Sequence, residues 1–132
     1  RFFMVLNLDF NSDKSIYVQI KEEITKAIAS GELKINESLP SVRSMAENIG
    51  VNLHTVNKSY NELKEEGFLN IDRRKGAIVA QLPMKIDNTT RQKNKLDLEL
   101  LVAKSYLSGI SKEEFLSLSS SLFDKYEVKY YE

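Results

Sequence analysis

The chain has 132 residues, 42% hydrophobic and 29% charged, which predicts a soluble globular protein with one domain, or one domain and an appendage. The absence of cysteine excludes a disulfide framework and a thiolate metal site, and it fits a cytoplasmic protein. The 19 basic and 19 acidic residues cancel, which argues against a nucleic-acid binder unless the cations are concentrated in one place.

The chain opens on the apolar segment RFFMVLNL, residues 1–8. A membrane span needs roughly 20 apolar residues, and no small-residue cleavage site of a secretory signal follows this segment. We therefore expect no membrane partner. Met4 is a candidate start of translation, which would make residues 1–3 foreign to the native protein.

Residues 15–50 predict two helices. The first carries apolar side chains at spacings of four and three, namely Ile16, Ile20, Ile24, Ala27 and Ile28. Gly31 is placed to end it, because glycine readily adopts the left-handed conformation that follows many helices. Ser41 is placed to cap the second helix, which ends at Gly50. Its apolar residues are Val42, Met45, Ala46 and Ile49.

The segment VNLHTVNKSY, residues 51–60, predicts a third helix with an unusual polar face. Asn52 is placed to cap this helix and Gly67 to close it. Its inward stripe is Val56, Tyr60 and Leu63. At about 100° per residue, a second face lies well away from that stripe. This face holds His54, Asn57, Lys58 and Asn61 and no carboxylate, whereas solvated helix faces usually mix Glu with Lys.

A hairpin is predicted next, because the β-prone segments FLNID and AIVA are joined by RRKG. The cations Arg73, Arg74 and Lys75 meet a single acid there, Asp72, so positive charge is concentrated despite the neutral total. Two helices joined by a glycine-containing turn, with a helix before and a hairpin after, make a winged helix-turn-helix. In that fold the third helix offers its polar face to the DNA major groove, where amides and cations suit base edges and phosphates.

Residues 81–132 predict a separate tail, a polar connector followed by two helices. Gly109 ends the first tail helix, and the capping box Ser111–Glu114 begins the second. The apolar stripes are Leu96, Leu100, Ala103 and Leu107 in the first, and Phe115, Leu118, Leu122 and Tyr126 in the second. Further leucines lie off these stripes, so the two helices cannot bury all of their apolar surface against each other. This predicts an interface, most economically with a second copy of the chain.

The stretch LPSVRSMAENIGVNLHTVNKSYNELKEEGFL, residues 39–69, resembles the DNA-binding domain of the GntR family of bacterial transcription regulators. The matches, across residues 14–80, are Tyr17, Gln19, Ile20, Gly31, Leu33, Leu39, Pro40, Ser41, Arg43, Thr55, Val56, Tyr60, Leu63, Gly67 and Gly76. The short tail, with its Gly-Ile-Ser-x-Glu-Glu-Phe junction, resembles the YtrA-type branch of this family. That resemblance implies a dimerisation tail and a repressor of its own operon, often one that encodes an ABC transporter.

The resemblance also implies which residues contact DNA. Arg43 matches the family arginine of the second helix, and Gly76 lies at the wing tip near the minor groove. The full candidate set is Ser41, Arg43, Asn52, Leu53, His54, Thr55, Asn57, Lys58, Arg73, Arg74, Lys75 and Gly76. Two positions depart from the family. Leu53 stands where many members carry an arginine, and Arg74 replaces the first of two wing glycines, so the operator sequence does not carry over from relatives.

Several of these residues also have a plainer interpretation. Arg43 is spaced to pair with Glu47, its neighbour one helical turn on. Leu53 lies at the edge of the apolar stripe, where packing in the core and contact with a thymine methyl group are equally compatible with its position. The RRK run is, in general, more often a solvated turn than a binding element. His54, the only histidine, lacks the nucleophile and acid that a catalytic base requires.

The sequence thus predicts a mainly α protein with a small β-hairpin. We expect a winged helix-turn-helix DNA-binding domain at residues 12–80, then a connector and a two-helix dimerisation tail at residues 81–132. The predicted function is a homodimeric repressor of an inverted-repeat DNA operator, with no cofactor, no metal and no enzymatic activity. The competing function is a winged-helix module that binds proteins, because fold alone does not dictate function. Such a module would carry an apolar or acidic third helix.

Overall fold

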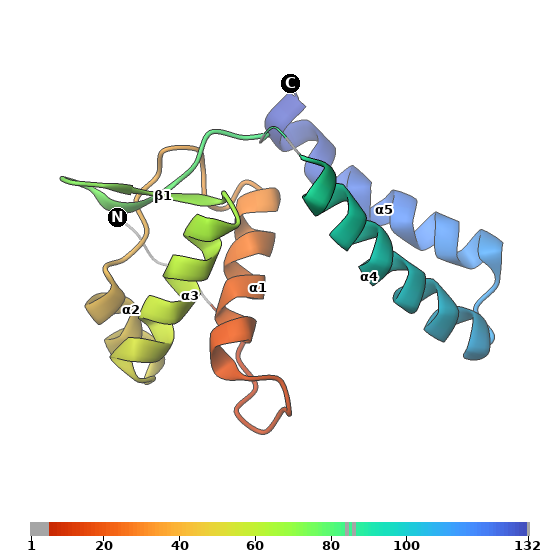
Figure 1. The fold of residues 1–132 in the computed structure, drawn as a ribbon, viewed down its shortest axis with the longest axis horizontal. Coiled ribbons are helices and arrows are strands. Elements are labelled where there is room, and N and C mark those ends of the chain that lie inside the picture. The colour runs from red at the N-terminus through yellow and green to blue at the C-terminus, as the bar shows by residue number, and fades with distance from the viewer. Residues whose placement is uncertain (1–5, 84, 86, 132) are drawn as a thin grey trace. The chain divides into compact units, whose positions relative to one another are not determined.

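The computed structural model describes residues 6–83, 85 and 87–131, with side chains described as far as residue 126. Met4 and residues 1–3 lie outside this range. The chain forms two compact units, Arg1–Leu82 and Pro83–Glu132 (Figure 1). The first unit holds three helices and a hairpin, and the second holds two helices.

The helices of the first unit are α1 (Ile16–Ala29), α2 (Val42–Ile49) and α3 (Leu53–Glu65). Ser41 caps α2, because its Oγ accepts a hydrogen bond from the Ser44 amide at 3.0 Å. Asn52 caps α3, because its Oδ1 accepts from the His54 amide at 2.7 Å. Gly50 lies between the two helices with a left-handed φ of 70°. The predicted starts of α2 and α3 and the glycine between them are therefore confirmed.

The hairpin, called the wing below, consists of β1 (Leu69–Asp72) and β2 (Gly76–Val79), which pair antiparallel. Its register places Leu69 opposite Val79 and Asp72 opposite Gly76. Residues 36–39 extend along the other side of β2, where the Leu39 amide donates to the Ala77 carbonyl at 2.8 Å. This third segment, which the sequence did not indicate, attaches the wing to the chain just before α2.

The core of the first unit forms where α3 packs against α1, α2 and β1 (Figure 1). Fully buried side chains include Ile20, Ile24, Leu33, Val56, Leu63, Leu69 and Val79. The predicted inward stripe of α3 is confirmed, because Val56, Tyr60 and Leu63 are at most 3% exposed. The predicted fold class, mainly helical with a winged helix-turn-helix, is the one observed.

Tyr60 connects α3 to the chain before α2. Its hydroxyl donates to the Pro40 carbonyl at 2.8 Å. Burial raises the pKa of Tyr60 above its ordinary value, so the phenol stays protonated and remains a donor. The tyrosine therefore holds α3 beside the start of α2 with a polar contact as well as with its ring.

Replacing Tyr60 by phenylalanine should lower the free energy of unfolding by about 0.5–1.5 kcal/mol, because one part-buried hydrogen bond is lost while the ring is kept. Urea denaturation measures the change. Tyr17→Phe is the matched control, since no hydrogen bond within the described residues involves the Tyr17 hydroxyl. Equal stability of the Tyr60→Phe variant and the wild type would contradict this role.

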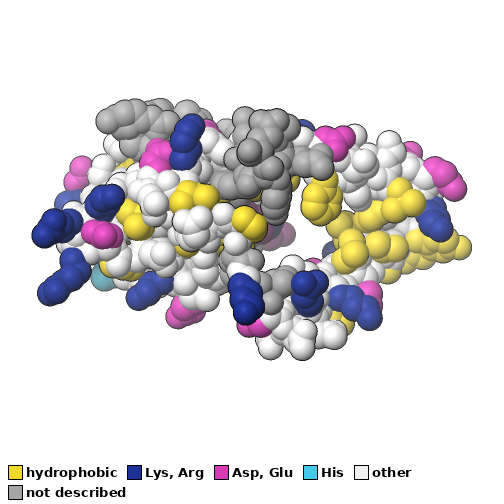
Figure 2. All heavy atoms as spheres, turned by 90° about the horizontal axis from the view of Figure 1, so that it is seen from above, with side chains coloured by type: hydrophobic (Ala, Val, Ile, Leu, Met, Phe, Trp, Pro, Cys, Tyr) yellow, Lys and Arg dark blue, Asp and Glu magenta, His cyan; other side chains and the backbone are white. Residues whose placement is uncertain are grey.

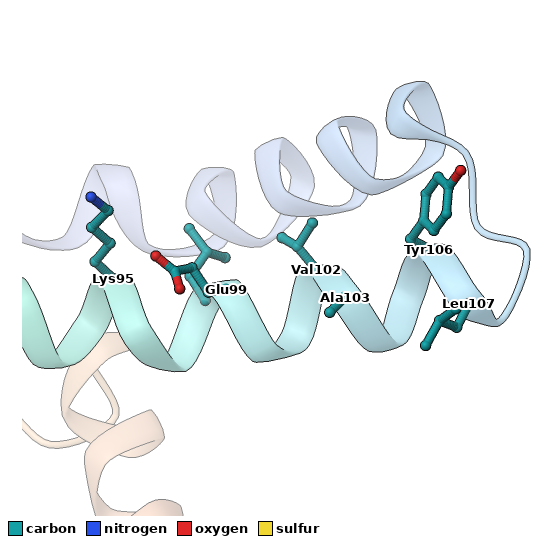
Figure 3. A pocket seen from close by; sticks show the side chains of 7 residues that line it. Lys95, Glu99, Val102, Ala103, Tyr106 and Leu107 are labelled. Carbon is teal, nitrogen blue, oxygen red and sulfur yellow. The ribbon is translucent and has the colours of Figure 1, made fainter.

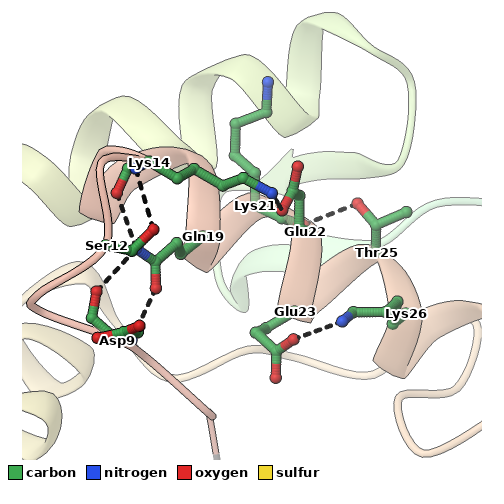
Figure 4. A network of polar contacts seen from close by, with 9 residues as sticks. All are labelled: Asp9, Ser12, Lys14, Gln19, Lys21, Glu22, Glu23, Thr25 and Lys26. Carbon is green, nitrogen blue, oxygen red and sulfur yellow. Dashed lines mark hydrogen bonds and ion pairs between the residues drawn. The ribbon is translucent and has the colours of Figure 1, made fainter. Parts of the chain in front are cut away.

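Gln19 holds the segment before α1 against that helix. Its buried side chain accepts from the Asp9 amide at 2.8 Å and donates to the Asp9 and Lys14 carbonyls at 3.0 and 2.8 Å (Figure 4). The Asn7 amide also donates to Glu23 at 3.1 Å. Residues 7–14 therefore pack on the first unit, and its contacts begin before residue 12.

The second unit consists of α4 (Asn88–Leu107) and α5 (Lys112–Tyr131), joined by a short turn (Figure 1). Asp87 caps α4 by accepting from the Thr90 amide at 2.8 Å, so this helix begins well before the apolar stripe that predicted it. Gly109, with a left-handed φ of 84°, lies just beyond the end of α4, as expected. At α5 the Ser111 hydroxyl accepts from the Glu114 amide at 3.1 Å, which is the hydroxyl half of the predicted capping box.

Neither α4, α5 nor any other helix within the described residues is both long enough and apolar enough to span a membrane. The same part of the chain contains no cluster of three or more His, Cys, Asp or Glu side chains that would suit a metal ion.

Candidate nucleic-acid interface

The polar face of α3 is exposed over its first two turns. His54, Asn57, Lys58 and Asn61 are exposed, whereas Val56, Ser59, Tyr60 and Leu63 of the same helix are buried. The first carboxylate of α3 is Glu62, in its last turns. The exposed face therefore begins with amide, imidazole and ammonium groups, which can bind base edges and phosphates without electrostatic repulsion.

Asn52 and Thr55, two further candidates on this helix, are less available than their neighbours. The Asn52 Oδ1 is engaged in capping, which leaves its amide nitrogen as the group able to contact a ligand. Thr55 is half-buried, and its carbonyl accepts from the Ser59 hydroxyl at 3.0 Å. Of these two, Asn52 therefore offers the more accessible polar group.

At the start of α2, Ser41 and Arg43 also differ in how available their side chains are to a ligand. The Ser41 oxygen caps the helix, while the Arg43 side chain is exposed. Within the described residues no ion pair joins Arg43 to Glu47, so the helical pairing that competed with DNA contact is not formed. The Arg43 guanidinium remains available for an anionic or base ligand.

The wing turn presents its cations to solvent. Arg73, Arg74 and Lys75 are all exposed, and Gly76 adopts a left-handed φ of 75°. The Asp72 carboxylate accepts from the backbone amides of Lys75 and Arg74 at 2.9 and 2.8 Å, which lowers the pKa of this carboxyl group below its ordinary value. In the part of the chain that the structure describes, no ion pair occupies the three cationic side chains.

Two lysines, Lys58 and Lys21, make contacts between α1 and the segment of α3 and its C-cap that shape the charge of this surface. The Lys58 ammonium lies 3.9 Å from the centre of the Tyr17 ring. The Lys21 ammonium, in contrast, contacts Glu62 at 2.9 Å and Glu66 at 2.6 Å. Burial by itself lowers the pKa of Lys21, but its hydrogen bonds to Glu66 and Glu62 outweigh burial and raise it.

The consequence is a separation of charge along α3. Lys21 neutralises acids in the last turns, while the first turns and the wing stay cationic or neutral. Figure 2 shows Lys and Arg side chains gathered at the end of the first unit seen at the left. Sequence reasoning identified the exposed residues but missed Lys21 and Tyr17, because each partner lies about 40 residues away and no local pattern links them.

The tail exposes most of its apolar residues. In α4 no residue is buried, and Leu96, Leu100 and Leu107 are 62%, 58% and 84% exposed. In α5 Leu118 and Leu122 are exposed, whereas Phe115 and Tyr126 are half-buried. Figure 2 shows hydrophobic side chains grouped over this unit, at the right. The predicted stripe of α4 is therefore exposed along its length, and that of α5 is exposed in part.

An open, almost entirely apolar groove of about 660 Å³ runs along α4 (Figure 3). Its lining is formed by Lys95, Leu98, Glu99, Val102, Ala103, Tyr106 and Leu107. Two of these residues, Ala103 and Leu107, belong to the predicted stripe. Leu98, Val102 and Tyr106 show that the apolar surface extends around α4 beyond that stripe.

Comparison with known proteins places this geometry in a family. The model of bacterial regulatory proteins of the gntR family matches residues 16–79. The chain is 33% identical over 107 residues to an uncharacterised HTH-type transcriptional regulator, YhcF of Bacillus subtilis, and the match covers 81% of this chain and 88% of YhcF. It is 29% identical over 115 residues to the HTH-type transcriptional repressor YtrA of the same organism, which covers 83% of this chain and 85% of YtrA.

Solved structures agree. A transcriptional antiterminator from Listeria monocytogenes superposes with a TM-score of 0.82 at 26% identity, over 90% of each chain. The AraR DNA-binding domain in complex with operator ORX1 superposes with a TM-score of 0.50 at 28% identity, over 59% of this chain and 100% of that one. The family consists of transcription regulators and not of enzymes. The chain belongs to the GntR family of bacterial regulatory proteins, as a short regulator of the YtrA type with a winged helix-turn-helix DNA-binding domain.

Proposed function

We propose that the protein is a homodimeric repressor that binds an inverted-repeat DNA operator in the cytoplasm. The observation that carries this proposal is the exposed polar and cationic surface formed by the carboxylate-free first turns of α3, Arg43 of α2 and the three cations of the wing turn. In a winged helix-turn-helix, α3 enters the major groove, while the wing lies along the adjacent backbone and minor groove. The operator-bound AraR domain supports this class of partner, and the name of the repressor YtrA supports repression.

Within this proposal the residues have different roles. Arg43, His54 and Asn57 are suited to base edges, because they are exposed and carry donors or acceptors. Lys58, Arg73, Arg74 and Lys75 are suited to phosphates. The Tyr17 ring holds the Lys58 ammonium in place, which reduces the freedom that this lysine loses on binding. Residues 12–80 thus form the DNA-binding domain.

The tail, residues 81–132, is proposed to hold two copies together. Exposed apolar surface on both α4 and α5 supports this role, because a surface of this kind usually marks an interface. A second copy also matches the symmetry of an inverted repeat, whose half-sites would lie about one helical turn, or a multiple of it, apart. By its resemblance to the YtrA-type branch, the protein is further proposed to repress its own operon, which would encode a transporter.

A winged helix that binds only proteins is the second candidate. It would be expected to present an apolar or acidic face on α3. The exposed residues of the first two turns are instead polar or cationic, apart from Leu53. This composition favours DNA over a protein partner.

Operator affinity should fall steeply with salt. If Lys58, Arg73, Arg74 and Lys75 of both copies contact phosphates, affinity should drop about a thousandfold or more between 50 and 200 mM salt, because each neutralised phosphate releases counterions. Fluorescence anisotropy with an operator selected from the source genome measures this. The Arg73→Ala variant should show a shallower dependence on salt, whereas Lys112→Ala, an exposed cation of α5, should not. A flat response, or equal affinity for random DNA at every salt concentration, would contradict the proposal.

A further inference from the structure

We propose that Leu53 determines operator specificity by contacting the 5-methyl group of a thymine in the major groove. This inference rests on the proposed function, since it names the base that one residue of the DNA-binding surface recognises. Leu53 is the first residue of α3, and its side chain is 38% exposed. Among helices α1–α3, all of which are described, it is the only large hydrophobic residue that is exposed.

Leu53 is not one of the positions of α3 that form the core of the first unit. The positions of α3 that face the core are Val56, Tyr60 and Leu63, which are 0%, 3% and 0% exposed. At about 100° per residue, Leu53 lies roughly 50° around the helix from the centre of that face. Leu53 therefore stands at the border of the core, and the exposed part of its side chain faces solvent in the single chain.

The surroundings of Leu53 are those of a base-reading surface. The Asn52 amide precedes it, His54 follows it, and Asn57 lies one helical turn further along the same side. All three are exposed and polar. Residues at the N-terminal end of a recognition helix approach base edges most closely. Leu53 is therefore an apolar contact set among hydrogen-bonding groups.

Base-pair chemistry selects the ligand of such a contact. The thymine methyl is the only methyl group on the major-groove edge of the four base pairs, where the other groups are mostly hydrogen-bond donors and acceptors. A leucine placed against a donor or acceptor would remove it from water without a hydrogen bond, which is unfavourable. Leu53 thus favours thymine and penalises the other bases at one position in each half-site.

Replacing thymine by uracil tests this directly, because only the methyl group is removed. With the full-length protein, each thymine of a selected operator is exchanged in turn for uracil in both half-sites. At one position the affinity should fall about fourfold per half-site, which corresponds to about 0.8 kcal/mol for one buried methyl group. For the Leu53→Ala variant, the thymine and uracil duplexes should bind equally well at that position.

Asn57→Ala is the matched control, since it lies on the same side of α3 but carries no apolar contact. It should weaken binding to both duplexes and preserve their ratio, which makes the comparison a double-mutant cycle. Thermal unfolding of Leu53→Ala should be close to that of the wild type. Operator binding in which no uracil substitution matters, or in which Leu53→Ala retains the full thymine preference, would overturn the role of Leu53 alone. Failure to select any operator would overturn the proposed function as well.

Discussion

A chain ended after residue 82 is expected to fold, remain monomeric and bind its operator about 100-fold or more weakly than the full chain. It should fold because the buried hydrophobic residues of the described structure all belong to the first unit, from Ile20 to Ala80. It should bind weakly because the tail supplies the high local concentration of the second DNA-binding domain, an effect worth about 10²–10⁴ in affinity.

Substitutions within the tail should act in the same direction. Leu100→Glu and Leu122→Glu place a charge on surfaces that are 58% and 42% exposed in the single chain but would be buried in the dimer. An unpaired charge buried at an interface is strongly unfavourable. Each variant should therefore dissociate to monomers while both units stay folded.

Analytical ultracentrifugation of the full, truncated and substituted chains measures this, together with operator titrations. Ser117→Glu is the matched control, because about 100° per residue places the exposed Ser117 about 140° around α5 from Leu122, on the polar side that carries Glu113 and Asp124. It introduces the same side chain without entering the apolar surface. A full-length protein that is monomeric at micromolar concentration, yet binds a palindrome tightly, would exclude the dimer.

Arg43→Ala and Asn57→Ala should each reduce operator affinity by about 1–3 kcal/mol if their side chains bind bases. Both side chains are exposed, so the loss should occur without a change in the thermal unfolding temperature. Because the dimer uses each residue twice, the measured loss can reach the upper end of this range. Titrations with operator and with random duplex separate specific from non-specific binding.

Arg43→Lys distinguishes two explanations for the arginine. A lysine keeps the charge but lacks the planar pair of donors that a guanine recognises. If Arg43 contacts a base, Arg43→Lys should lose nearly as much specificity as Arg43→Ala, whereas a phosphate contact should survive the change. Asn94→Ala, an exposed asparagine of α4, is the control for Asn57→Ala. Wild-type affinity in both Arg43→Ala and Asn57→Ala would remove these residues from the interface.

Local patterns in the sequence were sufficient to predict most of the secondary structure, though not the segment at residues 36–39 that pairs with β2. The caps at Ser41 and Asn52 and the glycine at position 50 act on backbone groups only two to four residues away. Helical periodicity likewise depends on near neighbours, so the buried stripe of α3 could be predicted, and its polar face followed from the same periodicity. The order of these elements then indicated the winged helix-turn-helix.

The tertiary structure decided which charged side chains contact another helix and which residues they contact there. Lys21 contacts Glu62 and Lys58 lies over Tyr17, across two helices. Periodicity assigns a residue to a face of its own helix, but it does not say which residue of another helix lies opposite. The same limit applied to the boundary residue Leu53. Its position in the sequence allowed either core packing or DNA contact. In the folded unit, α3 packs against its neighbours so that part of the Leu53 side chain stays in solvent. The sequence could not show this, because exposure depends on every element that surrounds a residue.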